Sequence, residues 1–463
     1  MKRILIAGTK SGCGKTTMTL ALLAALKKWG VPVASFKCGP DYIDPMFHRA
    51  VLGVETRNLD PFFSSPEELR AQLRKAEAKI AEKYGSSEDG ILLVEGVMGY
   101  YDGLGRTSEC STYSVAAATG TPVVLVVEAG GMSASVGAVL QGFRNYKADS
   151  GIKGVIFNGV SEKMQPFLKA IAEENGLRCL GCMPHEKEVT IGSRHLGLVT
   201  AQEISELQRK VDMLAEMAER CLDLELLWEL AEEAPMTEGE EKQKEAGTVK
   251  AESGPVIGIA RDAAFCFQYP ENLEILEKLG CRLRFFSPLK EQALPEGISG
   301  LWLPGGYPEL YLQELEQNEA MRTAVRAAVE GGMPTIAECG GFLYLHESAA
   351  GHQLAGVLAG QVFETKRLQR FGYTYLTARK DNLLGKAGEM LRTHEFHYWD
   401  SPDIGEDYEA VKAGSGRRNF CVHATETLWA GFPHLYLPAN PGAAEAFVRK
   451  AEEYACRTSS LQH

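Results

Sequence analysis

A glycine-rich loop near the start of the chain has the residue types needed to hold phosphate. Residues 8–17 read GTKSGCGKTT and lie between an apolar run and a helical pattern. Glycine lets backbone amides converge on phosphate oxygens, and the start of a helix adds a favourable dipole. Lys15 can reach the β- and γ-phosphates, and the Thr16 hydroxyl can contact Mg²⁺. The strict pattern has a glycine five positions before Gly14, where this chain has Thr9, so the loop is a variant of it.

Carboxylates and a lysine follow two other strand-like runs. The apolar run 91–94 ends in Glu95, and the second run is followed by Lys37, Asp41 and Asp44. A carboxylate at a strand end beside a phosphate-binding loop is a typical Mg²⁺ ligand. We therefore interpret Glu95 as a metal ligand, expect the two aspartates to complete the site, and expect Lys37 to meet an anionic substrate.

The second half of the chain contains a cysteine in a setting typical of a nucleophile. Residues 334–343 read PTIAECGGFL, which is an apolar strand, Cys339, two glycines and a helix-like continuation. Small residues permit the sharp turn of a nucleophile elbow, and a helix N-terminus favours the thiolate. The backbone amides of Gly305 and Gly306, after another strand, could form an oxyanion hole. A histidine is the usual base for such a thiol.

The elements that must position these residues follow an alternating pattern. Apolar runs and helical patterns alternate over about the first 195 residues, which predicts a mostly parallel, doubly wound sheet with its ligand site at the carboxyl ends of the strands. A second α/β pattern starts at Val256 and runs to the end. The predicted strands of the first half are 4–7, 33–36, 91–94, 123–127 and 154–157.

The two halves are separated by a helical segment and a charged stretch. Residues 232–254 are rich in Glu, Lys, Gly and Ala, which is typical of a solvated linker. The predicted fold is α/β, with two doubly wound domains joined by a helix and an acidic linker. The predicted limits are 1–198 for the first domain, 199–254 for the helix and linker, and 255–463 for the second domain.

Composition excludes several classes of function. The 463 residues carry a net charge of -12, which is a poor match for nucleic acid or an anionic membrane. An anionic substrate therefore requires a site where Lys15, Lys37 and Mg²⁺ make the local field positive. We see no signal peptide and no apolar stretch of membrane-spanning length, and the 11 cysteines are dispersed, so we expect a reduced cytoplasmic protein. The Cys179–Cys182 pair is interpreted as core packing.

These motifs together resemble the cobyrinate a,c-diamide synthase family. Its members fuse a P-loop domain, similar to dethiobiotin synthetase, to a class I glutamine amidotransferase domain of the cobyric-acid-synthase type. The resemblance covers nearly the entire chain except the linker. It rests on residues 8–17, 36–45, 95–103 and 193–198 in the first half and on 261–265, 269–272, 304–309, 338–341 and 394–398 in the second.

The resemblance implies site residues in the first domain. There, ATP would activate a carboxylate as an acyl phosphate in the presence of Mg²⁺, and ammonia would then attack it. The implied ATP-binding residues are Gly12, Gly14, Lys15, Thr16, Thr17 and Asn158, with Asn158 near the adenine. The metal ligands would be Thr16, Glu95 and one of Asp41 or Asp44, and the substrate-binding residues would be Lys37, Tyr42 and Asp102.

In the second domain the resemblance implies a cysteine–histidine pair. Cys339 would be the nucleophile, His434 would raise its nucleophilicity, and the oxyanion hole would comprise Gly305, Gly306 and Gly340. Family members often have a second histidine two residues after the first, where this chain has Tyr436, and the carboxylate that many amidotransferases place there is also absent. The group that orients His434 is therefore left open.

The implied reaction is the ATP- and glutamine-dependent amidation of the a- and c-carboxylates of cobyrinate in cobalamin biosynthesis. Two alternative substrates are hydrogenobyrinate and nickel-sirohydrochlorin, and cobyric acid synthase is a less favoured relative. A P-loop switch ATPase is a different class, against which the amidotransferase half argues. The expected partners are the tetrapyrrole, L-glutamine and ATP, without nucleic acid or membrane, and the resemblance is compatible with a homodimer.

Overall fold

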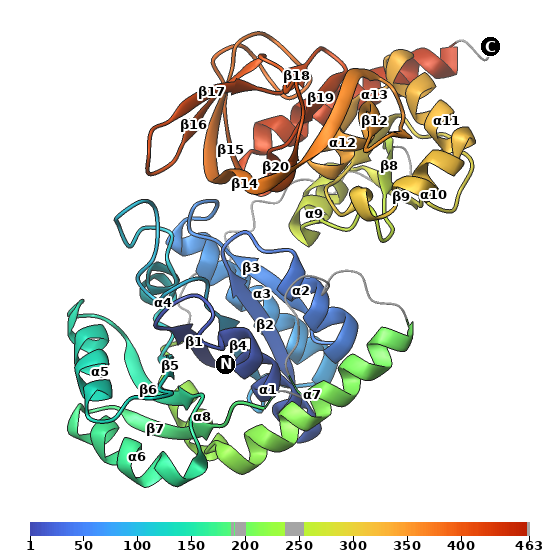
Figure 1. The fold of residues 1–463 in the computed structure, drawn as a ribbon. Coiled ribbons are helices and arrows are strands. Elements are labelled where there is room, and N and C mark those ends of the chain that lie inside the picture. The colour runs from blue at the N-terminus through green and yellow to red at the C-terminus, as the bar shows by residue number, and fades with distance from the viewer. Residues whose placement is uncertain (187–188, 190–200, 237–253, 461–463) are drawn as a thin grey trace. The chain divides into compact units, whose positions relative to one another are not determined.

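The chain folds into two compact units, residues 1–241 and 242–463 (Figure 1). The computed structural model describes residues 1–186, 189, 201–236 and 254–460. Residues 193–198, and most of the predicted linker, lie outside the described residues. The domain limits proposed from the sequence remain predictions, and each unit is described by itself below.

Unit 1 is built on a seven-stranded parallel sheet, with strand order β3-β2-β4-β1-β5-β6-β7. Five of these strands contain the apolar runs predicted from the sequence, whereas β3 and β7 were not predicted. The strand β3 reads TRNL and has no apolar run, and β7 contains Cys179 and Cys182, which pack in the core as free thiols. The strands are β1 (Lys2–Gly8), β2 (Val33–Cys38), β3 (Thr56–Leu59), β4 (Ile91–Glu95), β5 (Val123–Glu128), β6 (Ile152–Asn158) and β7 (Arg178–Met183).

Helices cover both faces of this sheet because successive strand residues point to opposite sides. One face packs against α1 (Lys15–Lys28), α7 (Ala201–Cys221) and α8 (Leu224–Glu232). The other face packs against α3 (Pro66–Tyr84), α4 (Thr112–Thr119), α5 (Ser135–Asn145) and α6 (Gln165–Glu174). This arrangement is the predicted doubly wound α/β fold.

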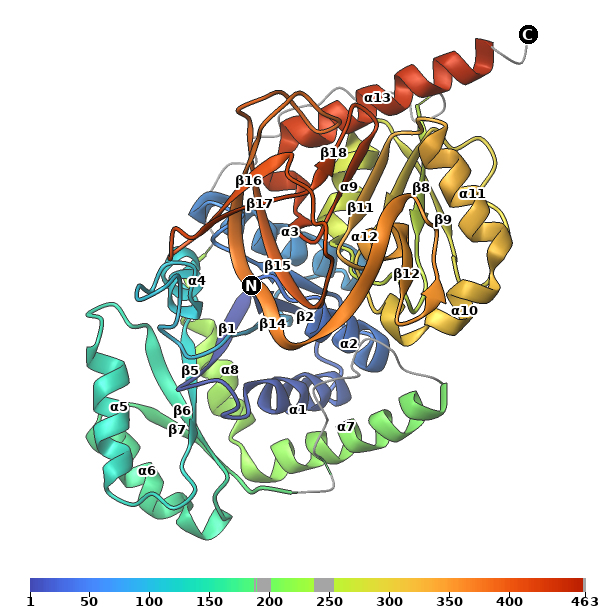
Figure 2. The same cartoon turned by 45° about the horizontal axis from the view of Figure 1, so that its top comes forward.

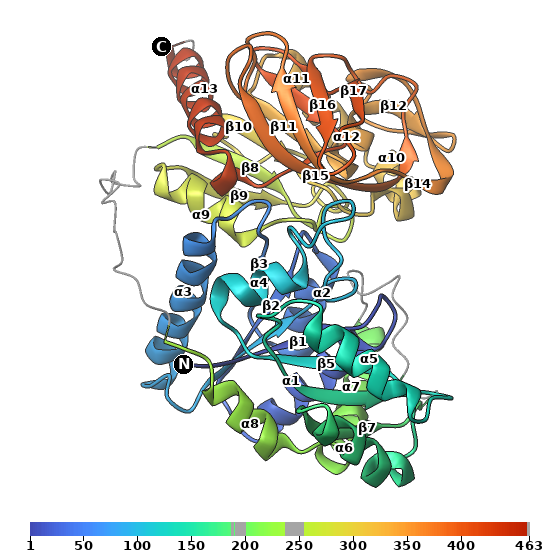
Figure 3. The same cartoon turned by 90° about the vertical axis from the view of Figure 1, so that its left-hand side faces the viewer.

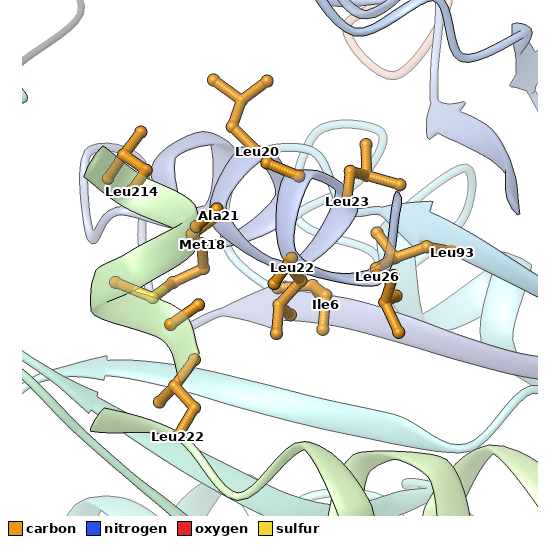
Figure 4. Packing of buried hydrophobic residues seen from close by; sticks show 14 of the residues in the cluster. Ile6, Met18, Leu20, Ala21, Leu22, Leu23, Leu26, Leu93, Leu214 and Leu222 are labelled. Carbon is orange, nitrogen blue, oxygen red and sulfur yellow. The ribbon is translucent and has the colours of Figure 1, made fainter. Parts of the chain in front are cut away.

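The helix that follows the phosphate-binding loop is held firmly by apolar packing. Met18, Leu22 and Leu26 of α1 are almost completely buried, and Figure 4 shows the helix with strand residues on one side and Leu214 and Leu222 of the α7 region beside it. Each fully buried leucine stabilises the fold by about 2 kcal/mol. The N-terminus of α1, which presents the loop, therefore has a rigid support.

Unit 2 also contains a mostly parallel sheet, with strand order β18-β19-β11-β10-β8-β9. Its strands are β8 (Val256–Ala260), β9 (Arg282–Phe286), β10 (Gly300–Leu303), β11 (Thr335–Glu338), β18 (His423–Ala424) and β19 (Leu428–Gly431). One face packs against α10 (Leu312–Gln317), α11 (Glu319–Glu330) and α12 (Gly340–Leu345), and the other against α9 (Pro270–Lys278) and α13 (Pro441–Ser460). The second α/β pattern therefore forms the expected layered sheet.

A further, mostly antiparallel sheet in unit 2 was not predicted from the sequence. Its strand order is β13-β12-β14-β15-β20, with β16 paired to β14 and β17 paired to β16 (Figures 2 and 3). Its strands are β12 (His346–Ala349), β13 (His352–Gln353), β14 (Leu358–Ala378), β15 (Met390–Asp400), β16 (Tyr408–Lys412), β17 (Arg418–Cys421) and β20 (His434–Leu435). Across both units, no described helix is both long and apolar enough to cross a bilayer.

Candidate functional site

The predicted phosphate-binding loop runs from the carboxyl end of β1 into the first turn of α1. Gly14 is the N-cap of α1 and has a left-handed backbone, with φ 99°. A Cβ added there would lie 2.3 Å from Nδ2 of Asn158, so only glycine fits. Asn158 donates from Nδ2 to the Cys13 carbonyl at 3.0 Å. Asn158, which is predicted to lie near the adenine, therefore also stabilises the loop backbone through this hydrogen bond.

Lys15 lies over the loop from which it extends. It is 8% exposed, and its Nζ donates to the Lys10 carbonyl at 3.1 Å. Burial lowers its pKa from the ordinary lysine value. The ammonium group of Lys15, which is predicted to bind phosphate, therefore lies beside the glycine-rich turn and next to the N-terminus of α1.

Lys37 and Glu95 face each other at the carboxyl ends of neighbouring strands, because β2 and β4 pair with these two residues in register. Lys37 Nζ lies 2.7 Å from Glu95 Oε1 and 2.5 Å from Asp44 Oδ2. The Asp41 Oδ2 atom is further away, at 3.9 Å. Thr16 donates from Oγ1 to the same Glu95 oxygen at 2.6 Å. The sheet therefore brings together the four predicted metal ligands and Lys37.

Burial and ion pairing shift the pKa values of this cluster in different directions. Burial raises the pKa of Glu95 to about 7 although Lys37 opposes the shift, and burial together with Asp44 raises the pKa of Asp41 to about 6. Burial also opposes ionisation of Asp44, but the Lys37 ammonium brings its pKa below the ordinary value. Lys37 itself has a pKa well above the ordinary value because its carboxylate neighbours outweigh its burial.

The charge of Lys37 is neutralised in this structure. We expected Lys37 to contribute to a positive site, but three carboxylates surround its single ammonium. The reason is that the strand register places Glu95 opposite Lys37 and the following short helix α2 (Ile43–Phe47) returns Asp44 to it. The cluster therefore has an excess of negative charge, which favours an added cation.

The donor set is suitable for Mg²⁺. Hydroxyl and carboxylate oxygens are its preferred ligands, and Mg²⁺ is usually held by one or two carboxylates with substrate phosphates and water. Thr16 and Glu95 supply such oxygens beside the loop, and one Glu95 oxygen is buried without a hydrogen-bond partner in the described structure. Among the described residues, no three His, Cys, Asp or Glu side chains form a ready metal cage. The arrangement therefore fits a cation that is shared with a bound nucleotide.

The remaining predicted residues of unit 1 also contact the backbone of this region. Asp41 Oδ1 accepts from the amides of Ile43 and Asp44, so it shapes the start of α2. Tyr42 is the N-cap residue of α2 and is 8% exposed. Asp102 accepts from the Gly99 amide at 2.8 Å. The roles of Gly12, Thr17, Tyr42 and Asp102 toward a ligand remain predictions.

His48 is a member of the cluster to which the sequence analysis gave no role. It is completely buried, its Nε2 lies 3.7 Å from Glu95 Oε2, and Thr56 Oγ1 lies 3.4 Å from its Nδ1. Burial lowers its pKa to about 4, so the imidazole is neutral near pH 7. Its position just after the Asp41–Asp44 segment was the only sequence signal for it.

In unit 2 the predicted nucleophile lies on a strained turn. Cys339 connects β11 to α12 with φ 47° and ψ -99°, which is an uncommon conformation for a residue other than glycine. Its amide donates to the Gly431 carbonyl at 2.8 Å. This geometry matches the predicted elbow. Burial raises the pKa of the thiol above its ordinary value, which opposes the expected preference for thiolate.

The predicted oxyanion glycines gather at this turn. A Cβ added at Gly340 would lie 3.1 Å from the Gly306 nitrogen, and one added at Gly306 would lie 2.1 Å from the Ala264 carbonyl oxygen. A hydrogen bond from the Gly340 amide to the Cys339 thiol opposes the rise in its pKa that burial causes. Because glycine has no side chain, the backbone segments of Gly306 and Gly340 can approach each other at this turn.

The predicted base reaches the same region from another sheet. His434 lies on β20, which pairs with β15 so that His434 is opposite His394, and the two rings stack with centroids 4.9 Å apart. A Cβ added at Gly305 would lie 2.5 Å from His434 Cε1. Burial lowers the pKa of His434 to about 3, so the ring is neutral at rest. Oε2 of Glu338 lies 3.6 Å from its Nδ1.

A P-loop domain and a cysteine-elbow domain in one chain define the class of glutamine-dependent amide ligases. Residues 2–192 match the model of an AAA domain, and residues 256–441 match the CobB/CobQ-like glutamine amidotransferase domain. The chain belongs to the cobyrinate a,c-diamide synthase family and is a glutamine-dependent amide ligase. The resemblance inferred from the motifs is thus confirmed.

Several relatives carry that family name along nearly their whole length. The cobyrinate a,c-diamide synthase of Caldanaerobacter subterraneus subsp. tengcongensis is 37% identical over 460 residues, which cover 97% of this chain and 98% of the relative. That of Clostridium tetani is 39% identical over 461 residues, covering 97% and 100%. That of Salmonella typhimurium is 40% identical over 408 residues, covering 86% and 85%.

Proposed function

We propose that this enzyme amidates the a- and c-side-chain carboxylates of cobyrinate in cobalamin biosynthesis, using ATP and L-glutamine. The observation that carries the proposal is the presence of two separate sites in one chain, a phosphate loop beside a carboxylate–lysine cluster and a cysteine elbow beside a histidine. The names of the relatives support the choice of cobyrinate. We place the reaction in the cytoplasm, and a homodimer remains a prediction.

The second unit would release ammonia from glutamine. His434 would take the proton of the Cys339 thiol, and the thiolate would attack the carboxamide carbon of glutamine. The amides of Gly306 and Gly340 would donate to the oxygen of the tetrahedral intermediate. Proton return from His434 lets ammonia leave with cleavage of the carbon–nitrogen bond. Water then hydrolyses the glutamyl thioester to glutamate and regenerates the thiol.

The first unit would activate the acceptor carboxylate. An oxygen of that carboxylate attacks the γ-phosphorus of ATP, which forms an acyl phosphate and ADP, and ammonia then displaces phosphate to give the amide. Lys15 would stabilise the phosphate oxygens during transfer. Mg²⁺, when bound by Thr16, Glu95 and one of Asp41 or Asp44, would neutralise phosphate charge. One ATP and one glutamine would be used for each amide.

Lys37 would hold the carboxylates of this site in place while its ammonium stays near the reacting groups. The structure supports this role because Lys37 is buried and contacts Asp44 and Glu95. An anionic substrate would then be attracted chiefly through Lys15, the loop amides and the bound cation, since the charge of Lys37 is already compensated.

Two substitutions test the division into two sites. Cys339→Ala should abolish glutamine-dependent amidation and leave ammonia-dependent amidation intact. Lys15→Ala should abolish synthesis with either nitrogen source. Loss of both activities in Cys339→Ala, with the protein still folded, would contradict the separate sites, and normal turnover of Lys15→Ala would contradict the assigned ATP site.

Mass spectrometry decides the substrate. Cobyrinate, hydrogenobyrinate and nickel-sirohydrochlorin are each incubated with the enzyme, ATP and glutamine. We expect a mass change of two amidations on cobyrinate alone. Amidation of only one of the other two tetrapyrroles would replace cobyrinate as the substrate, and glutamine-independent ATP turnover without amidation of any would favour the switch-ATPase alternative.

A further inference from the structure

The residue just before the predicted nucleophile carries a buried carboxyl group next to the predicted base. Glu338 is the last residue of β11 and is 1% exposed. Its Oε2 lies 3.6 Å from His434 Nδ1, and its Oε1 accepts from the Leu435 amide at 3.3 Å. The carboxyl group therefore contacts both the ring of the histidine and the backbone of the residue that follows it.

This position matters because the base lies on a different sheet from the nucleophile. Cys339 continues the parallel strand β11, whereas His434 lies on β20 and pairs with the antiparallel strand β15. Glu338 is the side chain of the nucleophile strand that reaches across to the β20 backbone. It therefore links the strand that ends at the nucleophile to the segment that carries the imidazole.

We propose that Glu338 is the positioning residue of the glutaminase site and takes the role of the third member of a Cys–His–Glu triad. A carboxylate facing Nδ1 holds the ring orientation and directs Nε2 toward the thiol. It also stabilises the imidazolium that forms when His434 accepts the thiol proton. The proposal rests on the proposed roles of Cys339 and His434, and it supplies the orienting group that the sequence left open.

The surrounding groups make an electrostatic role reasonable. His434 is faced by Glu338, the stacked ring of His394, and His397, whose proximity lowers the His434 pKa further. Burial raises the pKa of Glu338 well above its ordinary value, against the effect of the Leu435 amide. A positive charge on His434 would stabilise the buried Glu338 carboxylate in its ionised form. Charge formation at the two groups is therefore coupled.

The test compares Glu338→Gln with the wild-type enzyme in both nitrogen-source assays. Glutamine closely matches glutamate in size and keeps an acceptor for the Leu435 amide, but it removes the charge. We expect kcat for glutamine to fall by roughly 10²-fold or more, with an unchanged KM for glutamine and an unchanged ammonia-dependent rate. Glu338→Asp should recover part of the loss. Glu316→Gln is the matched control, because Glu316 Oε2 pairs with His352 Nδ1 at 2.8 Å in a partly exposed region of the same unit, and its glutamine turnover should stay normal.

A double variant separates positioning from a merely structural effect. The rate of alkylation of Cys339 by iodoacetamide is measured in Glu338→Gln, in His434→Ala and in the combined variant. If Glu338 acts through His434, the combined variant reacts no more slowly than His434→Ala alone, whereas a structural role makes the two effects additive.

Each outcome has a defined meaning. Glutamine turnover of Glu338→Gln within threefold of wild type, or additive effects in the double variant, would overturn the proposal. If Glu338→Gln does not fold, Glu338→Asp and its combination with His434→Ala provide the same comparison. Retention of glutamine use by Cys339→Ala would instead overturn the proposed function of the site, independently of Glu338.

Discussion

Replacement of Lys37 by methionine tests whether the buried cluster of unit 1 depends on a single ammonium. Lys37 is 4% exposed and has Glu95 and Asp44 oxygens at 2.7 and 2.5 Å. Removal of one partner from a buried ion pair costs about 3–5 kcal/mol, because it leaves an uncompensated charge. For a unit of this size, about 1 kcal/mol corresponds to roughly 2–4 °C in Tm. We therefore expect Tm to fall by about 6–20 °C.

The assay is differential scanning calorimetry of the full chain with EDTA present, so that no divalent cation replaces the ammonium. Because Lys37 lies in unit 1, the transition that includes unit 1 must move. The matched control is Lys28→Met: Lys28 also has a carboxylate oxygen at 2.7 Å, from Glu219, but its side chain is 52% exposed. Solvent screens such a pair, so its loss should change Tm little.

A second substitution tests the cause of the loss. Lys37→Met combined with Asp44→Asn removes one of the unpaired carboxylates and should recover part of the lost stability. The reasoning is refuted if Lys37→Met lowers Tm no more than Lys28→Met does. It is also refuted if the Asp44→Asn change adds its own destabilisation to that of Lys37→Met.

Three further predictions concern the loop and the thiol. Thr16→Ala should raise the Mg²⁺ concentration needed for ATP-dependent turnover about tenfold, which corresponds to about 1.4 kcal/mol of binding free energy. Thr16→Ser keeps the hydroxyl and should leave this concentration unchanged. The same Mg²⁺ dependence in Thr16→Ala and the wild-type enzyme would contradict the ligand role. Gly14→Ala should weaken ATP binding in calorimetry, because the added methyl group would meet the Asn158 side chain and the backbone has a positive φ there; wild-type affinity would argue against this steric reason. The rate of alkylation of Cys339 should rise about tenfold per pH unit between pH 7 and 9, because burial raises the pKa of the thiol. The exposed Cys456 serves as the internal reference. A rate that no longer rises below pH 8 would instead indicate that the thiol is already ionised at rest.

Much of the fold was predictable from short-range patterns. The apolar runs that form β1, β4, β5 and β6 are continuous, and the run that forms β2 is interrupted only by Ser35, because strands buried on both faces need apolar residues at nearly every position. The antiparallel sheet of unit 2 was not predictable in this way. Its longest strand, β14, has many exposed positions and register shifts against β15, so it has no simple alternation to detect.

The sequence by itself determined the two chemistries. The turn at Gly14–Lys15 and the turn at Cys339 are local structures, so their glycines and flanking strand patterns are readable without knowledge of distant contacts. The register between β2 and β4, by contrast, decides that Glu95 faces Lys37, and therefore that the lysine is neutralised. Such pairing is a long-range property of the folded sheet, which no local pattern records.

The same distinction applies to the thiol site. The motif around Cys339 predicted an elbow, but its sequence says nothing about how deeply the thiol is buried, and that burial opposes the expected preference for thiolate. Likewise, the sequence shows Glu338 only as an acidic residue at the end of a strand. In the folded structure β20 places His434 beside it. Residue type and spacing therefore determined which groups are available for chemistry. Only the tertiary structure decided their partners and charge states, because these depend on desolvation and on contacts between segments far apart in the chain.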